Sequence, residues 1–343
     1  MADFIAGVAR RSGMDVDFQK VFSGRSNVLA RLTPRDQIQR RILLAPHLDT
    51  VAVGAATQFI PRVKDGKLHG RGACDTKGSI AAMLTALGAI CKSGQRPRHT
   101  EIVFAGLVDE ENAQAGSRAL VASRFTADLA IVGEPTRLQA VTAHKGNLWL
   151  RLETQGKASH GARPELGRNA VHEMARIVDL LQTTYADRLR RRKHPLLGCA
   201  TISVGTIAGG TQPNIVPDRC VISADRRTLP GETEASVRIE VKKLLRQFGL
   251  NAAIADSKTD PCLPMETEWN TPLVREFLRC VRQKKPVGVH YFCDASVLSH
   301  GGVPSVVFGP GDIAQAHTSD EWISLRSLER STAMLISFLR AQP

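Results

Sequence analysis

The chain has 343 residues, of which 43% are hydrophobic and 23% charged, and its formal net charge is +13. Single hydrophobic cores stop growing at about 250 to 300 residues, so two domains are expected. No apolar run approaches the ~18 residues of a membrane span and the first residues do not form a signal peptide, so we expect a soluble, cytoplasmic protein with no membrane partner.

The excess of basic residues does not predict a nucleic-acid partner. Only residues 188–193 (RLRRRK) form a dense basic cluster, and aromatic residues, which stack on bases, make up 5% of the chain. A solvated basic face that attracts anionic substrates is the simpler explanation. The seven cysteines are odd in number and form no Cys-x-x-Cys pair, which favours reduced thiols over disulfides or a structural zinc knuckle.

The first part of the chain alternates strand-like and helix-like segments. Apolar runs at 41–45, 102–108 and 129–132 predict strands, and a helix is expected at 79–92. This order predicts an α/β domain with a mostly parallel, buried sheet. The stripe of the helix that is expected to pack on the sheet consists of Ile80, Met83, Leu84, Leu87, Ile90 and Cys91.

From residue 147 the pattern changes. The expected elements are a strand, a helix, two strands, a helix and a strand, at 148–154, 169–183, 201–207, 220–224, 235–248 and 251–254. This order is that of a small antiparallel α+β sandwich of ferredoxin-like type, and a strand at 304–308 returns to the first pattern. We therefore expect a discontinuous first domain of residues 1–145 and 256–343, with an inserted domain at 146–255.

Imidazole and acidic side chains follow the expected strands or lie in glycine-rich turns. His47 follows the first strand, and Asp49 points the same way in an extended backbone, so its carboxylate can orient the imidazole for metal binding. Asp75 lies in a glycine-rich segment just before the helix, and its two oxygens can bridge two cations. A surface histidine and a helix N-cap are the alternative interpretations of these positions.

Three consecutive carboxylates end the second expected strand. Asp109, Glu110 and Glu111 repel one another unless cations neutralise them or water solvates them as an exposed turn. One such carboxylate can bind a metal while its neighbour accepts a proton from water. Glu134 at the end of the next strand and His317 in a Gly-rich turn add two more donors. Because strand ends of an α/β sheet meet in one crevice, the repetition predicts a metal-dependent hydrolase.

These residues lie in segments that resemble, in order along nearly the whole chain, the dinuclear zinc amidohydrolases that include acetylornithine deacetylase, succinyl-diaminopimelate desuccinylase, aminoacylase and carboxypeptidase G. The matching segments are APHLDTV (45–51), GRGACDTKG (70–78), VDEEN (108–112), VGEPT (132–136), GKASHGARPELGRNA (156–170), PNIVPD (213–218), DRRTLPGE (225–232) and FGPGDIAQAHTSDEW (308–322). Family members usually carry an additional helix and strand ahead of the region where this chain begins.

The resemblance implies two divalent metal ions, zinc with cobalt as a substitute, in the first domain. It implies that His47 and Glu134 hold one ion, that Glu111 and His317 hold the other, and that Asp75 bridges them. The first domain is then a zinc-hydrolase catalytic domain, and the inserted domain serves for dimerisation or as a lid.

The resemblance also implies the catalytic and substrate-binding residues. Glu110 is the implied general base, and His160 of the partner subunit in a homodimer stabilises the oxyanion. Asn214 and Arg227 match positions that help to bind the substrate carboxylate, for which the planar fork of arginine is suited. The implied reaction is hydrolysis of the amide bond of a small N-acyl amino acid.

Three features resemble acetylornithine deacetylases and their near relatives more than desuccinylases: Cys74, FCDA (292–295) and GDIAQAHTSDEW (311–322). They imply conversion of N-acetyl-L-ornithine to L-ornithine and acetate, a step of arginine biosynthesis. Other activities of the same family stay open as alternatives: succinyl-diaminopimelate desuccinylase, aminoacylase, and dipeptidase or carboxypeptidase. A non-catalytic binding relative is the alternative from another class, although this chain retains Glu110 and every implied ligand.

Overall fold

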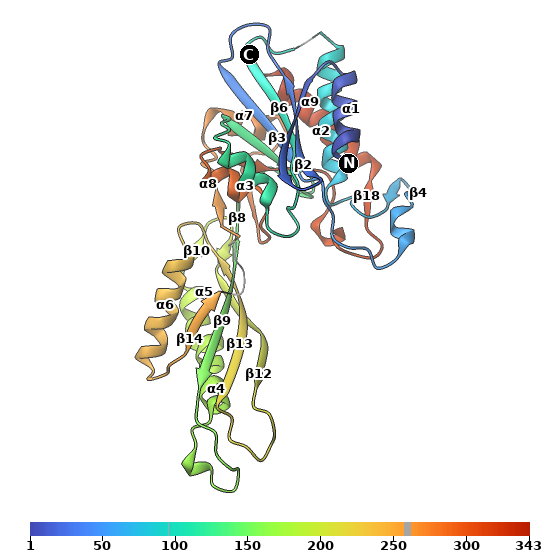
Figure 1. Cartoon of the computed structure of the whole chain (residues 1–343). Coiled ribbons are helices and arrows are strands. Elements are labelled where there is room, and N and C mark those ends of the chain that lie inside the picture. Colours follow the sequence, from blue (N-terminus) through green and yellow to red (C-terminus); the bar gives the residue numbers. More distant parts are fainter. Residues whose placement is uncertain (95, 257–261) are drawn as a thin grey trace. The chain divides into compact units, whose positions relative to one another are not determined.

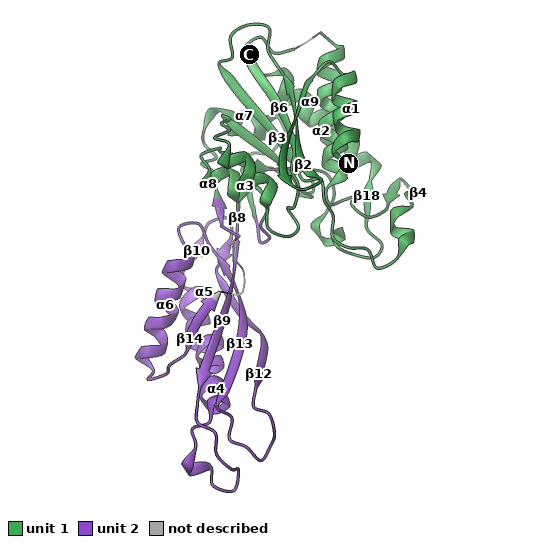
Figure 2. Ribbon diagram, viewed as in Figure 1, with its two compact units in different colours: residues 1–143, 266–288, 293–343 green, residues 144–265, 289–292 purple. Residues whose placement is uncertain are grey.

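The structure of the protein, a computed structural model, describes residues 1–94, 96–256 and 262–343. The chain divides into two compact units (Figure 2): unit 1 comprises residues 1–143, 266–288 and 293–343, and unit 2 comprises residues 144–265 and 289–292. Residues 144–145, 256, 262–265 and 289–292, which we expected in the first domain, thus cluster with unit 2.

Most helices and strands belong to unit 1 or to its main sheet (Figure 1). Its helices are α1 (Ala2–Arg11), α2 (Lys77–Lys92), α3 (Ala115–Ala122), α7 (Pro272–Cys280), α8 (Ala295–His300) and α9 (Leu325–Arg340), with 3-10 turns η1 (Ala56–Phe59) and η4 (Ile313–Gln315). The strands are β1 (Asp15–Phe22), β2 (Arg25–Leu32), β3 (Arg40–Pro46), β4 (Arg62–Lys64), β5 (Lys67–His69), β6 (Thr100–Gly106), β7 (Leu129–Gly133), β8 (Val141–His144), β15 (Met265–Glu266), β16 (Val287–Val289), β17 (Ser305–Val307) and β18 (Trp322–Ser324).

The main sheet has the strand order β1-β2-β6-β3-β7-β17-β8-β15, with β16 paired to β8. Its four central strands β6, β3, β7 and β17 are parallel, which confirms the expected parallel sheet, whereas β1, β2 and β8 pair antiparallel on either side. All residues of β6 and β7 are buried. Such burial on both faces is typical of a parallel sheet covered by helices, and it explains the continuous apolar runs.

A hydrophobic core of unit 1 lies where α1, α2, α7 and α9 pack against alternate residues of the central strands. Of the stripe predicted on α2, only Cys91 is not fully buried, and it still packs against this core. Phe277 of α7 contacts Phe308 and Phe338 edge-to-face, with ring centroids 5.2 and 5.1 Å away. These contacts pack α7 and α9 against the main sheet.

A second sheet of unit 1, in the order β18-β5-β4, joins distant parts of the chain. Trp322 lies opposite His69 and Ile323 opposite Leu68 in antiparallel register. The segment before β18 therefore lies against the segment that follows β5.

Unit 2 has the predicted ferredoxin-like order, with an antiparallel sheet β12-β13-β9-β14. Alternate residues of β13 are buried, so one face of this sheet is covered. The first helix runs beyond the expected end, because α4 continues through the π-helical turn η3 into α5. The elements are β9 (Gly146–Gln155), η2 (Pro164–Leu166), α4 (Ala170–Leu180), η3 (Leu181–Tyr185), α5 (Ala186–Arg190), β10 (Lys193–His194), β11 (Gly198–Cys199), β12 (Thr201–Gly209), β13 (Arg219–Thr228), α6 (Glu234–Gln247) and β14 (Ala253–Asp256).

Side chains fix the starts of the two main helices of unit 2. Oδ1 of Asn169 accepts the N–H groups of Val171 and His172 at the start of α4. Thr233 and Ser236 form a reciprocal capping box at the start of α6. Across the part of the chain that the structure describes, no helix is long and apolar enough to span a membrane.

Candidate metal centre

The carboxyl ends of three parallel strands of unit 1 carry the predicted donors. His47 follows β3, Glu110 and Glu111 come shortly after β6, and Glu134 follows β7. Because β3 lies between β6 and β7 in parallel register, these ends are neighbours. The structure therefore brings together side chains that are far apart in the sequence.

Asp75 lies between the two histidines. Its Oδ1 is 2.9 Å from Nε2 of His47, and its Oδ2 is 3.4 Å from Nε2 of His317. Nε2 of His317 is also 3.2 and 3.1 Å from the two carboxylate oxygens of Glu111, and Nε2 of His47 is 3.9 Å from Oε1 of Glu134. Each oxygen of Asp75 thus faces a different imidazole.

The donor set fits divalent cations. One potential ligand atom from each of His47, Glu110 and Glu134 lies within 4.8 Å of the others, and the same holds for His47, Asp75 and Glu111. Imidazole nitrogen and carboxylate oxygen suit zinc and similar metals. Buried carboxylates in this number are unfavourable without positive charge beside them. Glu110, which the resemblance assigns as the general base, thus lies as close to His47 and Glu134 as a metal ligand would. The sequence alone does not show that it lies so close to them.

Burial raises the pKa of both Glu110 and Glu134 well above the usual value. The imidazole of His47 opposes this effect, whereas the neighbouring carboxylate of Asp75 adds to it. Burial also disfavours a charge on His47, but the carboxylates around it, those of Asp49 and Asp75 first, outweigh burial and raise its pKa well above the usual value. These shifts favour the protonated forms of Glu110, Glu134 and His47, and a bound cation would act in the opposite direction on each.

Asp75 and His317 shift in opposite directions. Burial opposes the charge of Asp75, but hydrogen bonds from His317 and His47 lower its pKa well below the usual value. Hydrogen bonds to Asp75 and Glu111 raise the pKa of His317 to about 10. Opposite charges at this spacing stabilise each other, so Asp75 remains an anion between the imidazoles.

Asp49 contacts two of the strand ends. Nδ1 of His47 lies 3.1 Å from the backbone carbonyl oxygen of Asp49 and 3.7 Å from its carboxylate. The carboxylate oxygens accept the backbone N–H groups of Glu110 and Glu111, both at 3.2 Å. The carbonyl is thus the nearer partner of the imidazole, because the carboxylate is engaged in holding the acidic turn.

The three consecutive carboxylates do not share one role. Asp109 has a left-handed backbone (φ 70°), and its carboxylate lies 3.6 Å from Nη1 of Arg25 rather than in the donor cluster. Glu110 and Glu111 lie in the donor cluster. The turn therefore directs Asp109 towards Arg25, and it leaves Glu110 and Glu111 available for metal binding or catalysis.

Two buried acids near the cluster were not identified from the sequence. Oδ1 of Asp294 accepts a hydrogen bond of 2.6 Å from Ser117, and burial raises the pKa of Asp294 to about 6. Glu321 accepts hydrogen bonds from the segment that contains Asp75. Both acids lie in segments that match the family pattern. Their positions in the sequence do not distinguish them from exposed acidic residues.

The alternative interpretation of Asp75 as a helix cap does not hold. The N-cap of α2 is Thr76, and no side chain caps the helix at that residue. Its hydroxyl instead donates to the carbonyl oxygen of Gly133 at 2.8 Å. Asp75 is left free to face the histidines.

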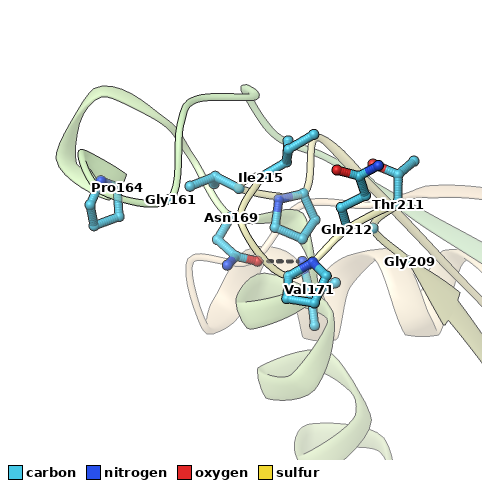
Figure 3. Close-up of a pocket in the computed structure, with 12 residues that line it drawn as sticks. Gly161, Pro164, Asn169, Val171, Gly209, Thr211, Gln212 and Ile215 are labelled. Atoms are coloured by element: carbon cyan, nitrogen blue, oxygen red, sulfur yellow. Dashed lines mark hydrogen bonds between the residues drawn. The ribbon is translucent and has the colours of Figure 1, made fainter.

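His160 and Asn214 lie together in unit 2. His160 forms an isolated β-bridge with Ile215, and the N–H of Gly161 donates to the carbonyl oxygen of Asn214 at 2.7 Å. Both His160 and Asn214 are exposed. A cavity of about 570 Å³ adjoins them, lined in part by Gly161, Asn169 and Ile215 (Figure 3).

Arg227 does not lie beside this cavity. In the antiparallel pair of β13 and β9 it is opposite Asn147, whereas Arg219, at the cavity end of β13, is opposite Gln155. Eight residues of extended strand separate the two arginines, which is about 26 Å at ~3.3 Å per residue. The guanidinium of Arg227 pairs with Asp225, with Nε 2.9 Å from Oδ1. Of the three site residues predicted in the inserted domain, His160 and Asn214 thus lie together, and Arg227 lies apart from them.

The fold and the cluster of imidazole and carboxylate donors are those of a metal-binding hydrolase. The chain belongs to the peptidase family M20/M25/M40, whose family model matches residues 43–341. The protein is accordingly a hydrolase that acts on amide bonds.

Individual relatives agree with this family. An acetylornithine deacetylase from Myxococcus xanthus is 33% identical over 306 residues, which cover 86% of this chain and 78% of the relative. The aminopeptidase PepT from Bacillus cereus has the same fold, with a TM-score of 0.81, 22% identity, and coverage of 98% of this chain and 91% of its own. A dinuclear metal binding peptidase of family M20 from Bacillus subtilis has a TM-score of 0.69 at 13% identity, over 99% of this chain and 90% of its own.

Proposed function

We propose that the protein is a two-metal amidohydrolase that cleaves the amide bond of an N-acyl amino acid. His47 and Glu134 would hold one zinc ion, Glu111 and His317 would hold the other, and Asp75 would be shared between the two. The observation that carries the proposal is the position of Asp75, with one oxygen 2.9 Å from Nε2 of His47 and the other 3.4 Å from Nε2 of His317. A bridging carboxylate needs this arrangement, and zinc or cobalt accepts these donors.

Two bound divalent cations supply Lewis acidity, which polarises a carbonyl and lowers the pKa of water. Glu110 is the general base, because its carboxylate adjoins the ligands but is not required to complete either set. It takes a proton from the attacking water and returns it to the leaving nitrogen. The water oxygen becomes bonded to the acyl carbon, the C–N bond breaks, and the products are a carboxylic acid and an amine. The carboxylate of Asp49 keeps Glu110 in place by accepting the backbone N–H of Glu110.

N-acetyl-L-ornithine is the proposed substrate, and its deacetylation would serve arginine biosynthesis. The similarity to the deacetylase from Myxococcus xanthus supports this choice. A cytoplasmic location fits the cysteines, since the structure describes all seven and none of them forms a disulfide.

Unit 2 is proposed to form a homodimer that completes the site. Strand β12 ends the sheet of this unit and exposes Ile207, and such edges pair readily with another chain. His160 of the partner subunit then donates a hydrogen bond to the oxyanion, while Asn214 and Arg227 bind the substrate carboxylate. Arg227 lies about 26 Å along β13 from Arg219, the first residue after the loop that contains Asn214, which is expected if Arg227 and Asn214 of one site come from different subunits.

A metal-supplemented substrate screen tests the proposal. The purified protein is stripped with a chelator, reloaded with Zn²⁺ or Co²⁺, and assayed for amine release from N-acetyl amino acids, N-succinyl-diaminopimelate and dipeptides. We expect the highest kcat/KM with N-acetylornithine, loss of activity on stripping and recovery on reloading. A preference for succinyl or dipeptide substrates would replace the substrate assignment. No turnover of any substrate with either metal would overturn the proposal.

A further inference from the structure

A buried carboxylate that the proposed chemistry does not use holds the loop that carries Asp75. Glu321 is only 2% exposed. Its Oε1 accepts the backbone N–H groups of Cys74 at 2.8 Å and Asp75 at 3.0 Å, and its Oε2 accepts the N–H of Gly72 at 2.9 Å. Nη1 of the buried Arg71 donates a fourth hydrogen bond at 2.8 Å.

These contacts compensate a charge that would otherwise be very unfavourable in the protein interior. An ionised acceptor with one guanidinium and three amide donors forms strong, charge-assisted hydrogen bonds. The loop can wrap around the carboxylate because Gly72 adopts φ 78°, and a Cβ there would lie 2.8 Å from Cγ2 of Thr50. Nζ of Lys77 closes the turn by donating to the carbonyl oxygen of Arg71 at 2.9 Å. The shape of the loop therefore depends on Glu321.

The same residue ties this loop to the segment that carries His317. The backbone oxygen of Glu321 accepts the N–H of Gly70 at 3.0 Å, and strand β18, which begins at the next residue, pairs with β5. His317, four residues earlier, has a left-handed backbone (φ 65°) and a side chain that is 55% exposed. Its imidazole contacts Asp75 and Glu111, and its segment is held by Gln58, whose Nε2 donates to the carbonyl oxygen of Ser319 at 2.9 Å. The contacts of Glu321 join this segment to the backbone of the Asp75 loop.

We propose that Glu321 is a positioning residue that sets the separation of Asp75 and His317 before a metal ion binds. The inference rests on the ligand assignment of the proposed function. Four hydrogen bonds occupy the carboxylate, so it acts through the loop and not as a ligand. Ligands that are held in place lose less conformational freedom on binding, and partners that orient ligands raise metal affinity for that reason.

Zinc titration of the Glu321→Gln variant tests the proposal. Glutamine preserves the size of the side chain, but its NH₂ group faces backbone N–H donors and cannot accept from them. Chelator-stripped wild-type and variant proteins are titrated with Zn²⁺ alone, well below the unfolding temperature. We expect the variant to bind at least one ion about 10- to 100-fold more weakly.

Glu101→Gln is the matched control. Glu101 is also a buried carboxylate of unit 1 that pairs with an arginine, Arg41, but it lies at the opposite end of β6 from the donors. We expect this control to lower the melting temperature and leave zinc affinity unchanged. Equal zinc affinity in wild type and Glu321→Gln, or an equal loss in both variants, would overturn the proposal.

Hydrogen exchange of the wild-type protein provides a second measurement if Glu321→Gln does not fold. The amides of Gly72, Cys74 and Asp75 should exchange slowly in the stripped protein, because Glu321 and not the metal holds them. Fast exchange at these three amides would contradict the proposal. The two proposals can fail separately: wild-type protein that binds no zinc refutes the ligand assignment, whereas tight binding that is insensitive to Glu321 refutes only the positioning role.

Discussion

The donor cluster of unit 1 and the His160 loop of unit 2 are built in opposite ways. In unit 1 the donors are largely buried, and other side chains hold the turns that carry them: Asp49 holds the acidic turn and Glu321 the loop with Asp75. In unit 2, His160 is exposed, and its Nδ1 accepts the nearby N–H of Ala162 at 3.1 Å. This contrast fits the proposed roles, since a metal pair needs donors held in advance, and a group proposed to act on a partner subunit must stay accessible.

The largest effect is expected for Glu110→Ala in unit 1. Loss of the general base should lower kcat by roughly 10²- to 10⁴-fold, while both zinc ions remain bound. Steady-state kinetics and zinc content by elemental analysis measure the two quantities on the same sample. A variant that loses zinc would show that Glu110 is a ligand, as its proximity to His47 and Glu134 would permit. Unchanged turnover would refute the catalytic role altogether.

A smaller effect is expected for His160→Ala in unit 2. Removal of one donor to the oxyanion should lower kcat by about 10²- to 10³-fold without any change in zinc content. His172→Ala, which removes another exposed histidine of the same unit, is the control and should behave as wild type. An unchanged kcat would mean that His160 belongs to an ordinary surface turn.

Mixing the two inactive variants sharpens the comparison between the units. If His160 acts on the partner subunit, a mixed dimer of Glu110→Ala and His160→Ala contains one intact site and should recover part of the activity. Each variant measured alone at the same concentration is the reference. A mixture that is no more active than its components would exclude action across the dimer.

The smallest effect concerns Glu153, on the solvent-facing side of β9. Hydrogen bonds from Arg219 and Arg151 lower its pKa to about 2. A carboxyl group with a lowered pKa stabilises the fold above its unfolded pKa of ~4.3, and this contribution disappears as the pH falls towards about 2. Urea unfolding should show Glu153→Gln slightly less stable than wild type at pH 7, with a smaller difference at pH 3. A difference that grows on acidification would contradict this assignment, and zinc content should not change.

Apolar runs predicted the buried strands well because burial on both faces of a sheet leaves a local signal. The run at 129–132 matches β7, and the run at 41–45 matches β3 within one residue at each end. The run at 102–108 extends beyond β6, which ends at Gly106; a Cβ at this glycine would lie 2.7 Å from Cδ2 of Leu48, a contact set by another strand end. Strands β1 and β2 were not predicted, since their antiparallel pairing at the flank of the sheet depends on distant partners.

The amino-acid sequence by itself determined which donors exist and that each follows a buried strand or a glycine-rich turn, because both signals are local. Only the tertiary structure decided that the two oxygens of Asp75 face different imidazoles, that Glu321 holds the loop beneath them, and that Arg227 lies far along β13 from Asn214. Those relations join residues that are tens to hundreds of positions apart. They arise from strand pairing and from the need of buried charges for partners, which no short stretch of sequence specifies.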